Sequence, residues 1–382
     1  MKTRSFLLAA GVMLAMAFTF SCSSDDGDEN GGGGGGGGGG GNGGSGSVSH
    51  GGQKYKTVKI GNQTWFAENL NYAGNDNSIG VCYDNAPANC TKYGRLYNIS
   101  EAMSACPDGW HLPSRDEWTI LMCGGKTKED LLAKNGWNNG NNGTDKYGFS
   151  ALPGGRSTAV GGFNSLGQLG VWRSTSMYTL VIGSNAGEGD SDNDNDESLF
   201  SVRCLKDETI AVVHGKSVNY GNETYPTVVI GTQTWFAKNL NYEVEGSRCY
   251  GDDPANCGIY GRLYDWETAK TVCPSGWHLP SKEEWDNLTC NIGSDAGKLK
   301  ATSGWNYGNG TDDYGFSALP GGNGYSDGSF SLVGIDGNWW SANEHESMSD
   351  YAYYRYMGYS LGSAGWNANY KSILVSVRCL QD

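Results

Sequence analysis

The sequence is poor in several residue types on which common functions depend. Only 9 prolines and 5 histidines occur in 382 residues, and charged side chains make up 18% of the chain. Lysine and arginine total 27 against 41 acidic residues, which gives a formal net charge of −14, and no basic run follows the first four residues. Because nucleic-acid binding needs clustered basic side chains, we expect no nucleic-acid partner.

The sequence also lacks two common metal-binding signatures, the HExxH motif and the CxxC pair. What is abundant is glycine, with 61 residues, and aromatic side chains, at 12%. This composition is typical of a loop-rich globular protein that contains strands. The length leaves room for about two domains of ~150 residues.

The amino-terminal residues have the organisation of an export signal. MKTR is followed by an apolar run at residues 6–20, which is short for a membrane-spanning helix. The run ends in TFSC, which resembles the lipobox of bacterial lipoproteins with Cys22 as the lipidated residue, although Thr19 replaces the usual aliphatic residue. We predict a signal peptide at residues 1–21 and a lipid anchor in the membrane at Cys22, with an ordinary cleavable signal peptide as the alternative.

Residues 22–47 have the composition of a disordered tether. The acidic segment SSDDGDEN precedes eleven consecutive glycines, and none of these residues can bury apolar surface. Acidic residues directly after the lipidated cysteine resemble the surface-export signal of Bacteroidota lipoproteins. The expected location is therefore the outer membrane, with the protein exposed at the cell surface, and a periplasm-facing protein is the alternative.

The rest of the sequence is an internal duplication. YKTVKIGNQTWFAENLNY at residues 55–72 returns as YPTVVIGTQTWFAKNLNY at residues 225–242, and DKYGFSALPGG returns as DDYGFSALPGG. A repeat of about 160 residues is too long for a solenoid unit. We therefore predict two tandem domains, joined by a linker, at residues 48–207, 208–217 (the linker) and 218–382.

Local patterns in each repeat predict an α+β fold with short helices and irregular, loop-rich antiparallel sheets. Gly61 and Asn62 lie between β-branched and aromatic residues, which is a hairpin signal. SRDEW and SKEEW each place glutamate three residues after serine, which predicts capping boxes at Ser114 and Ser281. A second helix is expected over ISEAMSA and DWETAKTV. Closing strands are expected at residues 172–175, 199–205, 339–342 and 373–380.

Ten of the eleven cysteines occupy matched positions in the two repeats, which indicates an oxidising compartment. Two pairs close small loops around a Pro-Ala-Asn turn, and two tie the helical region to the last strand. Cys123 and Cys290 remain, and we interpret them as buried thiols, with a bond between the domains as the alternative. The predicted disulfides are Cys82–Cys90, Cys106–Cys204, Cys249–Cys257 and Cys273–Cys379.

Four ordered motifs, each present twice, carry a family resemblance. WFAENLNY, CPDGWHLPSRDEW, YGFSALPGG and SVRCLKD resemble the Fibrobacter succinogenes major paralogous domain. That domain occurs in exported and lipid-anchored bacterial proteins and has no established biochemical activity. The motif order is more distantly similar to formylglycine-generating sulfatase-modifying enzymes and to C-type lectins. The resemblance implies two tandem C-type-lectin-like domains, stabilised by disulfides.

The motif CPDGWHLPSRDEW contains catalytic residue types, which we interpret as structural. His111 and His278 are the histidines at matched positions, and Glu117 is expected to cap a helix. The formylglycine-generating enzymes use a cysteine pair late in the domain, whereas only Cys204 or Cys379 occurs there in this sequence. We assign no catalytic residue, and a degenerate or unrecognised enzyme on that scaffold is the alternative.

No cofactor is assigned, and calcium is the one alternative considered. GDSDNDNDESL places carboxylates at alternate positions, a spacing that resembles calcium loops. The segment lacks the glycine and glutamate expected at the sixth and twelfth positions, and the second repeat has no carboxylate there, so we interpret it as a solvated acidic loop. The metal candidates are Asp190, Asp192, Asp194 and Asp196.

Aromatic residues of the second repeat suggest a binding function. SDYAYYRYMGYS predicts a strand whose alternate rings point to opposite faces, so that one face is exposed. GNWWSANE resembles the WND segment of C-type lectins. Exposed rings favour sugars and protein partners, so we expect a non-enzymatic binding or adhesion module for a glycan or protein ligand. A purely architectural surface protein is a further alternative. The predicted ligand residues are Trp339, Trp340, Asn343, Tyr351, Tyr353 and Trp366.

Overall fold

The computed structural model describes residues 46–158, 162–176, 178–183, 189–190, 197–359, 362 and 364–382. The predicted signal peptide, the anchor residue Cys22 and the tether up to residue 45 lie outside these ranges. Within the described ranges, no helix is long and apolar enough to cross a membrane.

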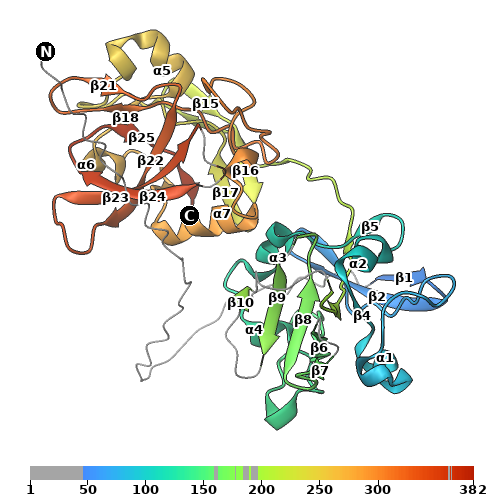
Figure 1. The fold of residues 1–382 in the computed structure, drawn as a ribbon. Helices are drawn as coiled ribbons and strands as arrows, with labels where there is room; N and C mark the ends of the chain where they lie inside the picture. Colours follow the sequence, from blue (N-terminus) through green and yellow to red (C-terminus); the bar gives the residue numbers. More distant parts are fainter. Residues whose placement is uncertain are drawn as a thin grey trace, which may run out of the picture. The chain divides into compact units, whose positions relative to one another are not determined.

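The first domain contains a hairpin of β2 (Gln53–Ile60) and β3 (Gln63–Phe66) (Figure 1). Ile60 pairs with Gln63, which confirms the turn predicted at Gly61 and Asn62. Gly61 has a φ of 60°, a conformation that only glycine adopts without steric cost. The other strands of this five-stranded sheet, whose order is β1-β2-β3-β12-β5, are β1 (Gly46–His50), β12 (Leu205–Lys206) and β5 (Trp110–His111).

A second five-stranded sheet has the order β10-β9-β8-β11-β4. Neighbouring strands of this sheet are antiparallel except β8 and β11, which are parallel, so the sheet is mixed. Its strands are β4 (Leu96–Tyr97), β8 (Leu169–Arg173), β9 (Thr179–Gly183), β10 (Gly189–Asp190) and β11 (Phe200–Ser201), and a separate pair is β6 (Arg156–Ser157) with β7 (Phe163–Asn164).

Short helices connect these strands. The predicted helix after Ser114 is confirmed as α3 (Arg115–Met122): the Ser114 side chain accepts from the Glu117 N–H, and the Glu117 carboxylate accepts from the Ser114 N–H at 2.7 Å. The expected ISEAMSA helix is confirmed as α2 (Ile99–Ala105). The predicted Pro-Ala-Asn turn is wrong, because Pro87 begins helix α1 (Pro87–Tyr93); proline fits there since the first helical N–H has no partner within the helix. A fourth helix is α4 (Lys128–Leu131).

The second domain repeats the two five-stranded sheets. The first contains β13 (Val213–His214), β16 (Thr227–Ile230), β17 (Gln233–Phe236), β26 (Leu380–Gln381) and β19 (Trp277–His278). The second contains β18 (Leu263–Tyr264), β25 (Val375–Ser376), β22 (Asp336–Glu344), β23 (Tyr351–Gly358) and β24 (Gly365–Tyr370). Two smaller pairs are β14 (Val218–Tyr220) with β15 (Glu223–Tyr225) and β20 (Asn323–Gly324) with β21 (Phe330–Ser331).

Three helices of this domain are α5 (Pro254–Tyr260), α6 (Trp266–Ala269) and α7 (Lys282–Asn291). Helix α7 has the capping box predicted at Ser281, with Glu284 as the partner. Strand β13 falls within the predicted linker and pairs with β16, so part of that linker belongs to the sheet of the second domain.

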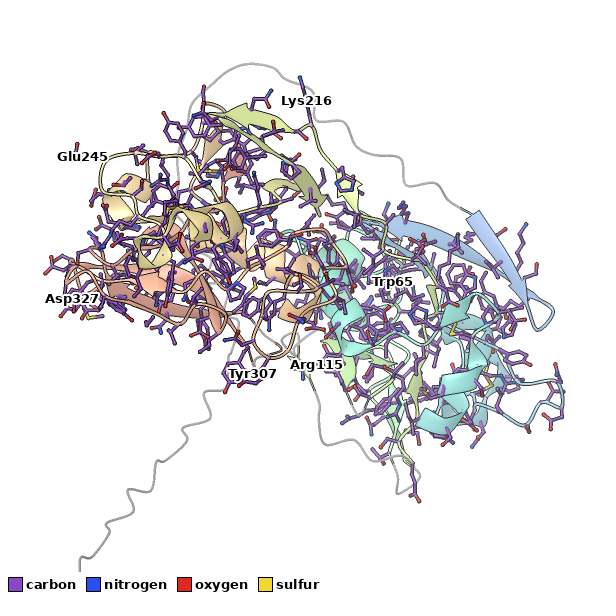
Figure 2. All side chains as sticks on the ribbon, turned by 90° about the horizontal axis from the view of Figure 1, so that it is seen from above. Trp65, Arg115, Lys216, Glu245, Tyr307 and Asp327 are labelled. Atoms are coloured by element: carbon purple, nitrogen blue, oxygen red, sulfur yellow. A yellow bond between two sulfur atoms is a disulfide. The ribbon has the colours of Figure 1, made fainter. Side chains whose placement is uncertain are left out.

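Each domain has its own aromatic core, and the two cores are built in the same way. Trp65 packs on Trp118 with ring centroids 4.6 Å apart, and Trp235 packs on Trp285 at 4.8 Å. All four rings are fully buried. Figure 2 shows Trp65 inside the first domain. The repeated tryptophans of the sequence therefore build the interior of each domain.

Candidate functional site

A buried arginine joins three of the repeated motifs. Arg203, from SVRC, donates to Asn69 Oδ1 at 2.7 Å and to the carbonyl oxygens of Phe66 and Phe149. Burial lowers the pKa of Arg203 to about 9. Trp172 Nε1 donates to the same Asn69 oxygen at 2.9 Å. The motifs WFAENLNY, YGFSALPGG and SVRC thus meet at one guanidinium group.

The second domain repeats this arrangement residue for residue. Arg378 donates to Asn239 Oδ1 at 2.8 Å and to the carbonyls of Phe236 and Phe316. Burial lowers its pKa to about 9 as well. Because a buried charge is tolerated only with its hydrogen bonds made, these motifs are explained by the core, without reference to a ligand.

The histidines of the repeated W-H-L-P segment form what we name the imidazole clasp: His111 with Asp207 and Glu117, and His278 with Asp382 and Glu284. His111 Nδ1 lies 2.5 Å from Asp207 Oδ1, and Nε2 lies 2.9 Å from Glu117 Oε1. In the second domain the corresponding distances are 2.6 and 3.0 Å. Each clasp ties the end of the last strand to the first turn of α3 or α7.

The clasp raises the pKa of both histidines. For His111 the hydrogen bond to Glu117 is the largest cause. For His278 burial is the largest influence and lowers the pKa, but the hydrogen bonds to Asp382 and Glu284 outweigh it. A general base needs a ring nitrogen that can reach a substrate proton, and here a carboxylate lies against each nitrogen. The clasp therefore has the geometry of a structural contact.

The structure contains the four disulfides that the sequence predicts within the domains. Cys82–Cys90 and Cys249–Cys257 close short segments, while Cys106–Cys204 and Cys273–Cys379 span 98 and 106 residues. Cys204 and Cys379, directly before the last strand of each domain, are fully buried. Every cysteine of the described ranges is bonded to another.

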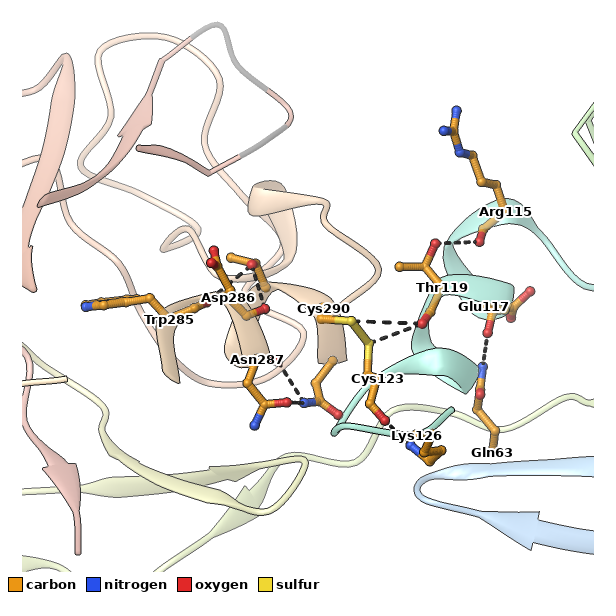
Figure 3. Close-up of a disulfide and its surroundings, with 12 residues drawn as sticks. Gln63, Arg115, Glu117, Thr119, Cys123, Lys126, Trp285, Asp286, Asn287 and Cys290 are labelled. Atoms are coloured by element: carbon orange, nitrogen blue, oxygen red, sulfur yellow. Dashed lines mark hydrogen bonds between the residues drawn. A yellow bond between two sulfur atoms is a disulfide. The ribbon is translucent and has the colours of Figure 1, made fainter. Parts of the chain in front are cut away.

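The interpretation of Cys123 and Cys290 as buried thiols is wrong. They form a fifth disulfide between the end of α3 and the last turn of α7, within the unit Gly43–Asp382 that holds both domains (Figure 3). Cys123 Sγ also lies 3.1 Å from the Thr119 carbonyl. The sequence placed both residues at matched positions in the two repeats, but it did not show that those positions meet.

Two predicted ligand residues are not on the surface. Trp339 and Trp340 of β22 are both fully buried, so their assignment to a ligand site is wrong. Trp339 Nε1 donates to Asn239 Oδ1 at 2.7 Å, and Trp340 Nε1 donates to the Tyr264 carbonyl at 2.8 Å. The reason is that this part of β22 is covered on both faces, so successive side chains are all buried.

Asn343 has a structural contact as well. Its Oδ1 accepts from the main-chain N–H of Lys282 at 2.8 Å, at the first residue of α7. The first N–H groups of a helix have no partner within the helix, so this side chain satisfies one of them. Asn343 therefore helps to fix the start of α7 beside β22.

The remaining predicted residues lie together on what we name the aromatic face: Tyr351 and Tyr353 of β23 with Trp366 and Tyr370 of β24. Tyr351 is directly opposite Tyr370, with ring centroids 4.4 Å apart. Tyr353 and Trp366 are 6.4 Å apart, edge to face. Tyr370 is 53% exposed, and the other three rings are partly exposed. All four point to one side because side chains alternate along a strand.

Charged side chains surround these rings. Lys282 Nζ lies 3.7 Å from the centre of the Tyr353 ring and 5.7 Å from that of Trp366, and the Arg355 guanidinium lies 4.7 Å from Trp366. The Tyr353 hydroxyl donates to Glu346, which raises the pKa of Tyr353 to about 12.

Sequence reasoning missed Tyr370, Lys282 and His345, whose ring stacks on Tyr353 at 5.1 Å. An even spacing from Trp366 along WNANY would have found Tyr370. No local signal places Lys282 there, because it comes from a different element.

The acidic segment offers no described site. Asp192, Asp194 and Asp196 lie outside the described residues, and Asp190 is described only as a backbone position of β10. Among the side chains that are described, no group of three or more histidine, cysteine or acidic residues could hold a metal ion.

Comparison with known proteins identifies the family but no function. The Fibrobacter succinogenes major domain matches residues 58–206 and 228–381, which is more than half of the chain. No curated protein and no solved structure matches. The chain belongs to the Fibrobacter succinogenes major domain family, and it contains two tandem copies of that domain.

Proposed function

We propose that this chain is an exported, lipid-anchored protein of the outer cell surface that binds glycans through the aromatic face of its second domain, without catalysis. We also propose that each domain has a C-type-lectin-like architecture. A disulfide in each domain that joins the segment after an early helix to the residue before the final strand supports that architecture.

The observation that carries the binding proposal is the cluster of four aromatic side chains on β23 and β24. Rings packed inside a core are explained by folding, but Tyr370 exposes 53% of its surface and its three neighbours are only partly buried. Pyranose rings stack on exposed aromatic rings through their C–H faces, and tyrosine and tryptophan also offer polar groups to hydroxyls. The neighbouring Glu346 and Asp350 are exposed and add hydrogen-bond acceptors.

The cysteines weigh against an enzyme on the formylglycine-generating scaffold. Such chemistry needs a reactive thiolate, and the late cysteines Cys204 and Cys379 are buried in disulfides. The two histidines of the repeated motif are also held between carboxylates. These contacts favour a binding role.

A glycan array tests the binding role with the full chain in detergent. The unaltered protein should bind glycans, and the variant Tyr351→Ala with Tyr370→Ala should bind at least about tenfold more weakly, since one central ring often contributes more than ~1 kcal/mol. Tyr307→Ala is the matched control, because Tyr307 is 69% exposed but pairs with Tyr359 instead. Signals at background for every glycan, or equal binding by the double variant, would refute the proposal.

The location is tested separately through Cys22. A Cys22→Ser chain should leave the membrane fraction and lose labelling by a radioactive fatty acid, whereas Cys123→Ser should keep both. Protease added to intact cells should cleave the unaltered protein if it faces outward. Protection from protease would place it at the periplasmic side.

A further inference from the structure

The cations beside the aromatic face are already paired. Lys282 Nζ, over the Tyr353 ring, lies 3.8 Å from Glu346 Oε1. Lys371, which follows Tyr370, lies over the Trp266 ring on the opposite side of the sheet, with its Nζ 3.0 Å from Glu344 Oε1. Each lysine side chain is less exposed than its acidic partner, at 30% against 70% and at 20% against 55%. A ligand approaching from solvent therefore meets the carboxylates before the ammonium groups.

The third cation, Arg355, is the least accessible to a ligand in solvent. Arg355 is 4% exposed, and its guanidinium donates to Asp286 Oδ1 at 2.7 Å and to Thr289 at 2.8 Å. The same Asp286 oxygen accepts from Trp366 Nε1 at 2.8 Å. This arginine therefore holds α7 and Trp366 in place, and its charge is neutralised by Asp286 within the protein.

The amino terminus of α7 is satisfied too. Helix N-termini attract anions through unpaired N–H groups. Here the Lys282 N–H donates to Asn343 Oδ1, and the Glu284 N–H donates to Ser281 Oγ. The Glu284 carboxylate also adds negative charge to this first turn. No anion is needed to complete this end of the helix.

Exposed acids extend around the same rings. Glu346 and Asp350 are both exposed in the turn that joins β22 to β23, next to Tyr351 and Tyr353. Like charges that meet in an interface are strongly unfavourable. A uronate or sulfate group on a ligand would have to approach these carboxylates without a free cation to compensate it.

We propose that the aromatic face selects uncharged glycans and rejects glycans that carry carboxylate or sulfate groups. This inference rests on the proposed function and gives it a ligand class. The rings supply the stacking surface, while Lys282, paired with Glu346, packs against Tyr353 and Trp366. The exposed acidic side chains accept hydrogen bonds from sugar hydroxyls and repel anionic sugars.

Matched ligand pairs test this selectivity by isothermal titration calorimetry on the full chain in detergent. The probes are β-1,4-linked hexasaccharides of glucose, mannose and galactose, each with its counterpart oxidised at C6 to the uronic acid. At 20 mM salt the uncharged member of a pair should bind at least about tenfold more tightly. At 500 mM salt the difference should shrink, because screening weakens charge repulsion.

A charge variant provides the sharper test. Glu346→Gln with Asp350→Asn removes two carboxylates and frees Lys282, so the affinity for the oxidised ligand, relative to that for the uncharged ligand, should rise at least about tenfold. Glu245→Gln, a surface acid on a different loop, is the control and should change neither value.

The outcomes separate the two claims. Equal or tighter binding of the oxidised ligands by the unaltered chain would overturn the selectivity and leave glycan binding standing. An unchanged preference in the Glu346→Gln, Asp350→Asn variant would also overturn it. Absence of binding to all six ligands would refute the proposed function together with the selectivity.

Discussion

The two domains have equivalent cores but differ in the length of the strands around the repeated tryptophan, which is Trp172 in β8 and Trp339 in β22. In the first domain β8 and β9 have five residues each, whereas in the second β22 has nine and β23 eight, and β24 extends the sheet further. Trp172 pairs with Leu180 in the first domain, and the equivalent Trp339 pairs with Arg355 in the second. Tyr178 and Tyr353, each two residues before that partner, therefore occupy equivalent positions in the two sheets. A cation stacks on both tyrosines, Arg115 on Tyr178 and Lys282 on Tyr353.

The exposure of that shared position separates the domains. Tyr178 is 7% exposed and belongs to the core, whereas Tyr353 is partly exposed beside three further rings. At the position after the repeated tryptophan, the first domain has the buried Arg173 and the second has the buried Trp340. Both copies of the domain have thus kept the same tryptophan–arginine core, but they differ in which side chains at the edge of the sheet are exposed to solvent.

The largest expected effect tests the part that the domains share. Arg203→Met or Arg378→Met should each lower the free energy of unfolding by about 3–5 kcal/mol, because the asparagine and carbonyl oxygens around the guanidinium stay buried without donors. Urea unfolding followed by tryptophan fluorescence measures both, with the exposed Lys59→Met as control. A clear difference between the two arginine variants would show that the matched contacts are not energetically equivalent.

Next in size is a test at the shared tyrosine. Tyr178→Ala should cost about 3 kcal/mol of stability, because it leaves a cavity in the core, and should not change glycan affinity. Tyr353→Ala should cost less than about 1 kcal/mol but weaken glycan binding by about tenfold. Thermal unfolding and calorimetric titration of both variants give the comparison. Equal stability losses would contradict the assignment of one ring to the core and the other to the surface.

The bond between the domains is expected to contribute a comparable amount. Cys123→Ser with Cys290→Ser should lower stability by about 2–4 kcal/mol and separate the unfolding of the two domains into distinct steps. Differential scanning calorimetry would resolve those steps, and Cys82→Ser with Cys90→Ser, within one domain, is the control. A single transition at an unchanged temperature would show that the bond does not couple the domains.

The smallest effect concerns the imidazole clasp in both domains. The raised histidine pKa means that the stabilisation is complete below about pH 6.5, the unfolded value, and is lost as pH rises through the higher folded pKa. Glu117 and Glu284 have lowered pKa values, since contacts with histidine and serine outweigh burial, so their contribution is lost at acidic pH. With the histidine side chains 36% exposed, solvent screening leaves about 1 kcal/mol or less for each clasp.

His111→Gln and His278→Gln should therefore each flatten the pH dependence of stability above about pH 6.5. NMR titration of the imidazole resonances in the full chain checks the direction of the shift. A histidine that titrates at or below its ordinary pKa would contradict the clasp. His214→Gln, in the exposed strand β13, is the control.

Much of the local structure could be predicted because its causes are local. The capping boxes at Ser114 and Ser281 depend on residues three positions apart, and the β2–β3 turn depends on a glycine at positive φ. The closing strands were placed within a few residues, although β12 and β26 are separate short strands that follow β11 and β25.

Features that depend on distant residues were harder to predict. Nothing near Trp340 indicates that β22 is covered on both sides, and nothing near Cys123 indicates that α7 brings Cys290 to it. His111 finds its second partner, Asp207, 96 residues later. The aromatic face was predicted in part, because alternation along β23 is local, but Lys282 reaches it from a helix.

The sequence by itself determined the duplication, the family, the matched cysteines and the local elements of each domain, because repetition, capping and turn chemistry act over a few residues. The tertiary structure decided which tryptophans are buried, which helix ends share a disulfide, and which charges neutralise one another around the rings of β23 and β24. Those outcomes depend on packing between elements that are far apart in the chain. A pattern of neighbouring residues does not show which distant elements pack against each other.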